Sequence, residues 1–137
     1  RDIDLSKFNT QNVTHMICMF RRCNSLISLD LSHFNTQNVT HMNCMFNECS
    51  ALLNIDLSNF NTQNVDDMNF LFNGCKSLIN LDLSNFNTSN VVDMGYMFNK
   101  CNKIKEIKGI NIFNTIRKVM QIVFFYQLFN IYMITFT

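Results

Sequence analysis

The chain has 137 residues, of which 47% are apolar, so it is about one domain long and can bury a core. With 11 basic and 10 acidic residues its formal net charge is +1, which excludes the strongly basic surface typical of nucleic-acid-binding proteins. The sequence contains no long run of basic residues, so it does not predict binding to an anionic membrane.

A repeat of 26 residues organises the sequence, and four copies run without a gap from Ile3 to Glu106. Their shared pattern is I/L-D-L-S-x-F-N-T-x-N-V-x-x-M-x-x-M/L-F-x-x-C-x-x-L/I-x-x. We therefore expect residues 1–106 to form four repeats. Residues 107–137 are expected to form a degenerate fifth repeat that acts as a C-terminal cap.

Each copy begins with a predicted strand and continues into a predicted helix. In the second copy, apolar and polar residues alternate over residues 29–32, which is strand spacing. After a corner at residues 34–36, Asn38 stands where a helix N-cap belongs. The next apolar residues follow the spacing of one helix face about three turns long, namely Val39, Met42, Met45, Phe46 and Cys49.

Stacking such units predicts an α/β repeat, a leucine-rich-repeat-like right-handed solenoid with short parallel strands on one face and short helices on the other. Its interior should hold columns of identical side chains. We expect two such ladders, formed by Phe8, Phe34, Phe60 and Phe86, and by Cys23, Cys49, Cys75 and Cys101.

The fifth copy starts at Ile107 and decays, and Val119–Thr137 then has no charged residue in 19 positions. We interpret this tail as a last unit that covers the open end of the stack. Its length also suits a membrane segment, and membrane contact is expected only in that case. A frame-shifted or truncated end is the third alternative.

The stretch from Leu81 to Cys101, LDLSNFNTSNVVDMGYMFNKC, resembles the bacterial surface protein 26-residue repeat of the BspA-like leucine-rich-repeat family. The resemblance covers residues 1–106 well and residues 107–137 loosely. It implies a cell-surface or secreted protein with a role in adhesion or host contact. The family offers no catalytic residues to carry over.

The cysteines of the ladder are expected to be buried free thiols, because free cysteine is among the most buried residue types. Cys18 and Cys44 project from the other side of the predicted helices, where later copies have Phe70 and Tyr96. A Cys18–Cys44 disulfide between neighbouring copies stays an alternative to two half-exposed thiols.

His15 and His41 should lie one above the other near predicted helix N-termini, solvated, with metal binding by the pair as the alternative. Neither these residues nor His33 form a catalytic arrangement with a nucleophile. No glycine-rich phosphate loop or other cofactor motif occurs, so we expect no enzyme, no cofactor and no resident metal.

One regular polar feature remains, on the exposed face of the predicted sheet. An Asp column and a Ser column should run across it, formed by Asp4, Asp30, Asp56 and Asp82 and by Ser6, Ser32, Ser58 and Ser84. Neighbouring carboxylates about 4.8 Å apart repel by about 1 kcal/mol in water. Solvation, a raised pKa or a bound Ca²⁺ relieves that repulsion.

We therefore predict a non-catalytic surface interaction or adhesion module that contacts a protein partner, host or extracellular, through the Asp and Ser columns. A structural spacer and an intracellular scaffold are the alternatives. The columns contain no aromatic or Arg side chain, so affinity should come from avidity over many copies.

Overall fold

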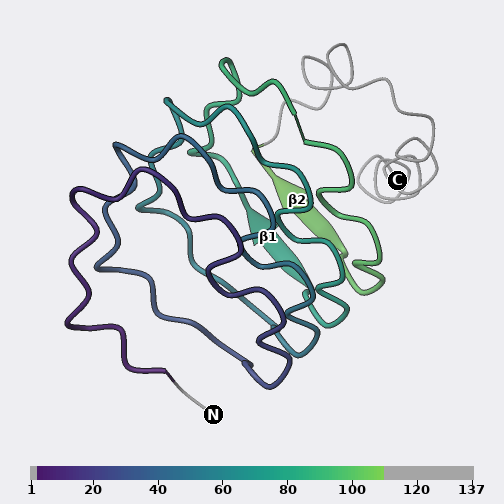
Figure 1. The fold of residues 1–137 in the computed structure, drawn as a ribbon. Coiled ribbons are helices and arrows are strands. Elements are labelled where there is room, and N and C mark those ends of the chain that lie inside the picture. Colours follow the sequence, from purple (N-terminus) through teal and green to yellow (C-terminus); the bar gives the residue numbers. More distant parts are fainter. Residues whose placement is uncertain (1–2, 110–137) are drawn as a thin grey trace.

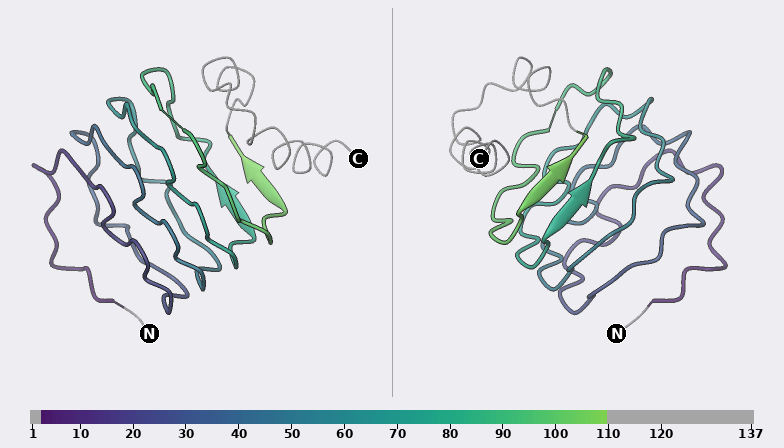
Figure 2. Two further views of the ribbon diagram at one scale, coloured as in Figure 1. Left: turned by 45° about the vertical axis from the view of Figure 1, so that its right-hand side comes forward. Right: turned by 180° about the vertical axis from the view of Figure 1, so that it is seen from behind.

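The computed structural model describes residues 3–109. Consecutive copies of the repeat, residues 3–28, 29–54, 55–80 and 81–106, lie side by side, each as one circuit of the chain (Figure 1, Figure 2). Two strands occur in the described part, β1 (Asn80–Asp82) and β2 (Glu106–Lys108). They pair in parallel with Leu81 opposite Ile107, so the copies are in register at 26 residues.

The predicted helices are absent, and a run of reverse turns replaces each of them in the described residues. In the second copy, the backbone N–H groups of Met45, Asn47 and Cys49 donate to the carbonyl oxygens three residues earlier, at 3.2, 3.0 and 3.1 Å. Such bonds over three residues close turns, whereas an α-helix closes over four.

Left-handed backbone at two positions per copy prevents the helix. Cys44 has a φ of 59° and Glu48 a φ of 62°, while every residue of a right-handed helix needs a negative φ. The equivalent residues share this conformation, which recurs at Cys18, Phe70 and Tyr96 and at Arg22, Gly74 and Lys100. The turn pattern is therefore a property of the repeat.

Hydrogen bonds between copies use the backbone N–H and C=O groups that an α-helix would pair within itself. The N–H groups of Met42, Cys44, Phe46 and Glu48 donate to carbonyl oxygens of the third copy at 2.7–3.0 Å. The acceptors are the carbonyl oxygens of every second residue in that copy, namely Asp67, Asn69, Leu71 and Asn73. Alternate N–H groups thus join neighbouring copies, and the remaining ones close the turns.

These observations correct the predicted fold class. The α/β solenoid of leucine-rich-repeat type, with short helices on one face, is wrong because the described chain has no helix and only two short strands. The expected N-cap Asn38 instead donates its side-chain amide to the Gln11 carbonyl oxygen of the preceding copy at 2.8 Å. Asn64 and Asn90 make the same contact to Gln37 and Gln63.

The core lies inside the circuits and consists of side chains that repeat along the stack. The rings of Phe20, Phe46, Phe72 and Phe98 form one row, with centroids 5.7, 5.4 and 5.9 Å apart and planes within 7° of parallel. In the predicted phenylalanine ladder, Phe34 and Phe60 are buried and Phe86 is half-buried. Phe8 in the first copy is 52% exposed.

The predicted membrane segment and cap, Val119–Thr137, lie outside the described residues. Within residues 3–109 there is no helix of the length and apolarity needed to cross a bilayer.

Candidate functional site

The Asp column is fully accessible to solvent, since Asp4, Asp30, Asp56 and Asp82 are all exposed. Each carboxylate accepts a hydrogen bond from the backbone N–H of the serine two residues later, at 2.9–3.0 Å. This is an Asx turn, and it forms just before the chain bends. In the second copy the bend is closed by the Phe34 N–H, which donates to the Leu31 carbonyl oxygen at 2.9 Å.

Hydrogen bonding keeps the Asp column ionised. The side-chain and backbone hydrogen bonds from Ser6 lower the pKa of Asp4, and those from Ser84 lower the pKa of Asp82 in the same order. For Asp30 and Asp56 the backbone hydrogen bond from the serine is the larger cause of the lowered pKa. Each aspartate thus has a structural role in its turn while its side chain stays exposed to solvent.

Repulsion between neighbouring carboxylates is weak at this column. It is the smallest of the causes acting on the pKa of Asp56, where Asp30 raises the value, and the hydrogen bonds from Ser58 outweigh it. In residues 3–109 no three His, Cys, Asp or Glu side chains gather into a group that could hold a metal ion. The predicted Ca²⁺ site therefore has no support from this geometry.

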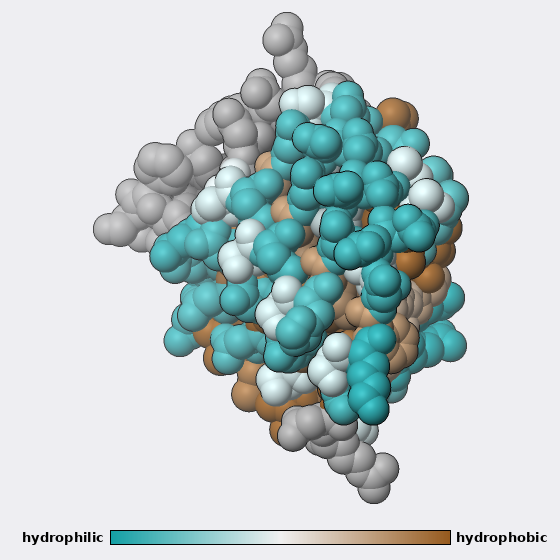
Figure 3. All heavy atoms as spheres, turned by 90° about the vertical axis from the view of Figure 1, so that its left-hand side faces the viewer, coloured by the Kyte–Doolittle hydropathy of each residue, from teal (hydrophilic) through white to brown (hydrophobic). Residues whose placement is uncertain are grey.

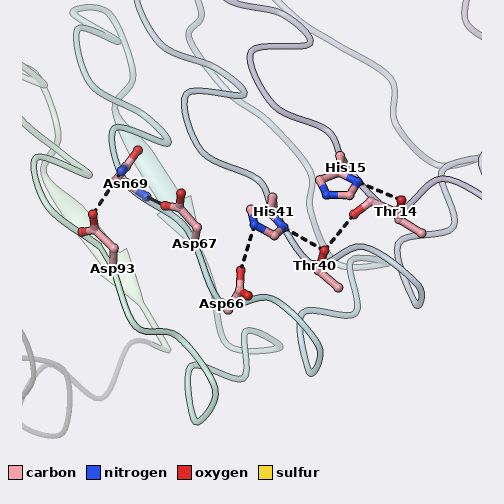
Figure 4. Close-up of polar contacts among 8 residues, drawn as sticks. All are labelled: Thr14, His15, Thr40, His41, Asp66, Asp67, Asn69 and Asp93. Carbon is pink, nitrogen blue, oxygen red and sulfur yellow. Dashed lines mark hydrogen bonds and ion pairs between the residues drawn. The ribbon is translucent and has the colours of Figure 1, made fainter.

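A second polar column lies where the predicted helices were to begin (Figure 4). Parallel bridges connect His15 to His41, His41 to Asp67, and Asp67 to Asp93. The two imidazole rings stack with centroids 4.7 Å apart. The neighbouring Thr14 and Thr40 hydroxyls lie 2.8 Å from the Nδ1 atoms of these rings.

Carboxylates complete this second column. Asp66 Oδ1 lies 3.7 Å from His41 Nε2, a partner that the sequence analysis missed although the 26-residue register places Asp66 and Asp67 beside His41. Burial, and then the nearby Asp93 carboxylate, raise the pKa of Asp67 above its usual value despite the hydrogen bond from the Asn69 N–H. The Asn69 side-chain amide bridges to Asp93 Oδ2 at 3.0 Å.

The ladder cysteines face inward and bind backbone. The thiols of Cys49, Cys75 and Cys101 donate to the carbonyl oxygens of Phe20, Phe46 and Phe72 in the preceding copy, at 3.0, 3.2 and 2.9 Å. Burial raises the pKa of Cys49 to about 11 and that of Cys101 to about 12, and it raises the pKa of Cys75 strongly. Cys23, in the first copy, is half-buried.

These thiols suit a structural role, because the thiolate is the reactive form of cysteine and a raised pKa keeps it scarce at neutral pH. All six cysteines of the described part are free thiols.

Comparison with known proteins identifies one family. The family model described as Mycoplasma protein of unknown function, DUF285, matches residues 1–113. Neither the curated proteins nor the solved structures contain a match to the chain.

Proposed function

Because the chain belongs to the family described as Mycoplasma protein of unknown function, DUF285, we propose that it is a non-catalytic surface module that binds a protein partner through its Asp and Ser columns. The finer relationship proposed here is with the BspA-like surface proteins, whose 26-residue repeat the sequence resembles. An adhesive role at the cell surface or after secretion follows from that relationship.

One observation carries the proposal. Each copy presents one exposed carboxylate at the same place, held in the same orientation by the serine two residues later. In-register neighbours place these charges about 4.8 Å apart. A fixed row of negative charge recognises a partner whose basic side chains repeat at a matching distance.

Supporting evidence comes from the groups that carry chemistry elsewhere in the chain. The most buried thiols serve as hydrogen-bond donors to the backbone, and His15 and His41 stack on each other. Their contacts hold copies together. The described surface also includes a broad hydrophilic face, as expected of a protein exposed to water (Figure 3).

Binding through this row should be multivalent. A single exposed ion pair contributes only about 0–1 kcal/mol, so four separate contacts give weak binding. Several chains displayed together gain much more through effective concentration. We therefore expect low affinity for one chain and strong adhesion for a surface coated with it.

The test replaces the aspartates at all four positions of the column by asparagine. Asparagine keeps the side-chain oxygen that accepts the serine N–H, so the turns remain while the charge is removed. The probe is a synthetic lysine-rich peptide immobilised on a sensor, with a neutral peptide of equal length as reference. We expect the wild-type chain to bind in low salt and the quadruple variant to lose at least tenfold in affinity.

A pH series and a control variant make the test decisive. Since the pKa of each column aspartate is lowered, binding should persist as the pH falls to the ordinary carboxyl range and should weaken only below it. The matched control changes Asp66 and Asp93 to asparagine and should bind like the wild type. Equal binding by the quadruple variant, to this peptide or to an identified protein partner, contradicts the proposal.

A structural spacer is the second candidate, and the composition of the column favours it. Aromatic and Arg side chains usually carry interface energy, and the column has none. An intracellular scaffold is the third, because six free thiols suit a reducing compartment. Absence of binding in surface-capture screens favours the spacer, and binding only to intracellular proteins favours the scaffold.

A further inference from the structure

Two cysteines stand apart from the buried thiol ladder. Cys18 and Cys44 occupy the same position in the first and second copies, and both are half-buried. Their backbones match, with φ values of 56° and 59°. The Cys18 N–H donates to the Asn43 carbonyl oxygen at 3.0 Å, so the two residues lie on adjacent segments in register.

Side chains at this repeat position touch their counterparts in the next copy. In the third and fourth copies the position holds Phe70 and Tyr96, whose rings stack with centroids 4.9 Å apart and planes 12° from parallel. These residues share the left-handed backbone of the two cysteines, so their Cα–Cβ bonds point the same way. The shared backbone and register therefore place the thiols of Cys18 and Cys44 next to each other, as the two rings are.

A thiol–thiol contact also appears in the electrostatics of the pair. Burial is the largest cause that raises the pKa of Cys44, and the neighbouring Cys18, by its charge and its hydrogen bond, raises it further. Arg21 and the Asn47 side chain act in the opposite direction and lower this pKa. Cys44 is half-buried and lies near a cation, whereas the ladder cysteines Cys49, Cys75 and Cys101 are buried.

We propose that Cys18 and Cys44 form an intramolecular disulfide that links the first copy of the repeat to the second, and that the ladder cysteines stay reduced. Neighbouring in-register segments are separated by about 4.8 Å, which lies within the Cα–Cα range of disulfides of about 4.4–6.8 Å.

The reaction is thiol–disulfide exchange with a small disulfide such as oxidised glutathione. The thiolate of one cysteine attacks a sulfur of the small disulfide, forms a mixed disulfide and releases one small thiolate. The second cysteine, as a thiolate, attacks the protein-bound sulfur and releases the second. One protein disulfide forms, the oxidant is reduced to two thiols, and those thiols take up the two protons lost by the cysteines.

Selectivity follows from access. Cys49, Cys75 and Cys101 are buried, and each donates its proton to a backbone carbonyl oxygen. Attack requires both a thiolate and an open path to the oxidant. Because Cys18 and Cys44 are only half-buried, access favours this pair over the three buried cysteines.

The experiment oxidises the folded chain with oxidised glutathione, alkylates the remaining thiols in denaturant and maps the products by mass spectrometry. Trypsin releases Cys18 in residues 8–21 and Cys44 in residues 23–76. We expect two of the six thiols to resist alkylation, and these two peptides to be joined. On unfolding in urea, the oxidised chain should show a higher midpoint than the reduced chain.

Variants assign the link to its partners. In the Cys18→Ser and Cys44→Ser variants, every remaining thiol should be alkylated after oxidation. In the matched control Cys23→Ser, two thiols should still resist alkylation. Six alkylated thiols in the oxidised wild-type chain overturn the proposal, and this measurement needs no variant. A link between the same peptides that persists in Cys44→Ser overturns it as well.

Discussion

At the scale of single residues, the left-handed backbone decides which side chains each copy tolerates. The position of Arg22, Glu48, Gly74 and Lys100 has a φ of 62–76° in every copy, and one copy uses glycine. Only glycine adopts this region without a steric penalty, which is about 1–2 kcal/mol for other residues. The Arg22–Glu48 ion pair, at 2.7 Å between exposed side chains, offsets little of that penalty.

Replacing the exposed Lys100 by glycine should therefore stabilise the chain. We expect Lys100→Gly to raise the free energy of unfolding by about 0.5–1 kcal/mol, because relief of strain exceeds the extra entropy of the unfolded glycine. Gly74→Ala should lower it by a similar amount or more, because the φ of 76° is strained for a residue with a Cβ, which would also lie 3.3 Å from the Glu48 Cγ atom. Urea denaturation followed by circular dichroism measures both changes.

Lys103 provides the control for this comparison. It is exposed and has no left-handed backbone, so glycine there gives no relief of strain and should be neutral or destabilising. If Lys100→Gly destabilises the chain as much as Lys103→Gly does, the left-handed position carries no strain.

At the scale of elements, the sequence shows the period but leaves the local conformation open. A 26-residue period predicts that positions such as 41 and 67 lie together, and the parallel bridges lie at this spacing. The apolar spacing of Val39, Met42, Met45, Phe46 and Cys49 suggested a helix. Consecutive turns bury the same residues, so this spacing does not distinguish the two structures.

Gly74 was the available signal for a turn, and it occurs in one copy of four at that position. The other copies place Arg22, Glu48 and Lys100 there, all good helix formers. Tertiary contacts override that preference, because alternate N–H groups find carbonyl partners in the next copy. The composition of a single copy contains no information about this partner.

The candidate site was predictable in part, for a related reason. Alternation placed Asp30 and Ser32 outside, and both are exposed. Their hydrogen bond depends on a local turn, which the strand interpretation did not include. The contact between His41 and Asp66 joins two copies, so it needs the register as well as the sequence.

Threonine hydroxyls hold the copies together at the corner. Thr36 is buried; its hydroxyl donates to the Asn61 carbonyl oxygen at 3.0 Å and accepts the Asn61 N–H at 2.8 Å. Thr10 and Thr62 make the same paired contacts to the copies that follow them. The pair of hydrogen bonds therefore satisfies both backbone groups of the partner asparagine.

Thr36→Val removes both bonds and keeps the side-chain shape. We expect it to lower the free energy of unfolding by about 2 kcal/mol, since two part-buried hydrogen bonds to Asn61 are lost at about 1 kcal/mol each. Thr36→Ser keeps the hydroxyl and loses one methyl group, so it should cost about 1 kcal/mol. Equal costs for the two variants in urea denaturation would show that the hydroxyl contributes nothing.

At the scale of the whole molecule, each copy is stable only through its neighbours. The described chain has only two short strands, and long-range contacts between copies supply the core. Among residues 3–109, five of the seven exposed large apolar side chains belong to the first copy, namely Ile3, Phe8, Ile17, Met19 and Ile27. Burial therefore increases from the first copy toward the middle. The contribution of a core residue to the free energy of unfolding should accordingly depend on its place in the stack.

The phenylalanine row tests this dependence with chemically identical substitutions. Phe72 is fully buried and stacks on Phe46 and on Phe98, whereas Phe20 is 4% exposed and stacks on Phe46 alone within its row. Phe72→Ala should cost about 3–5 kcal/mol, and Phe20→Ala clearly less, because fewer neighbours line its cavity. Should Phe72→Ala fail to fold, Phe72→Leu and Phe20→Leu give the same comparison at lower cost. Equal losses at both positions would mean that the copies contribute independently, and the stack would then be a row of separate units.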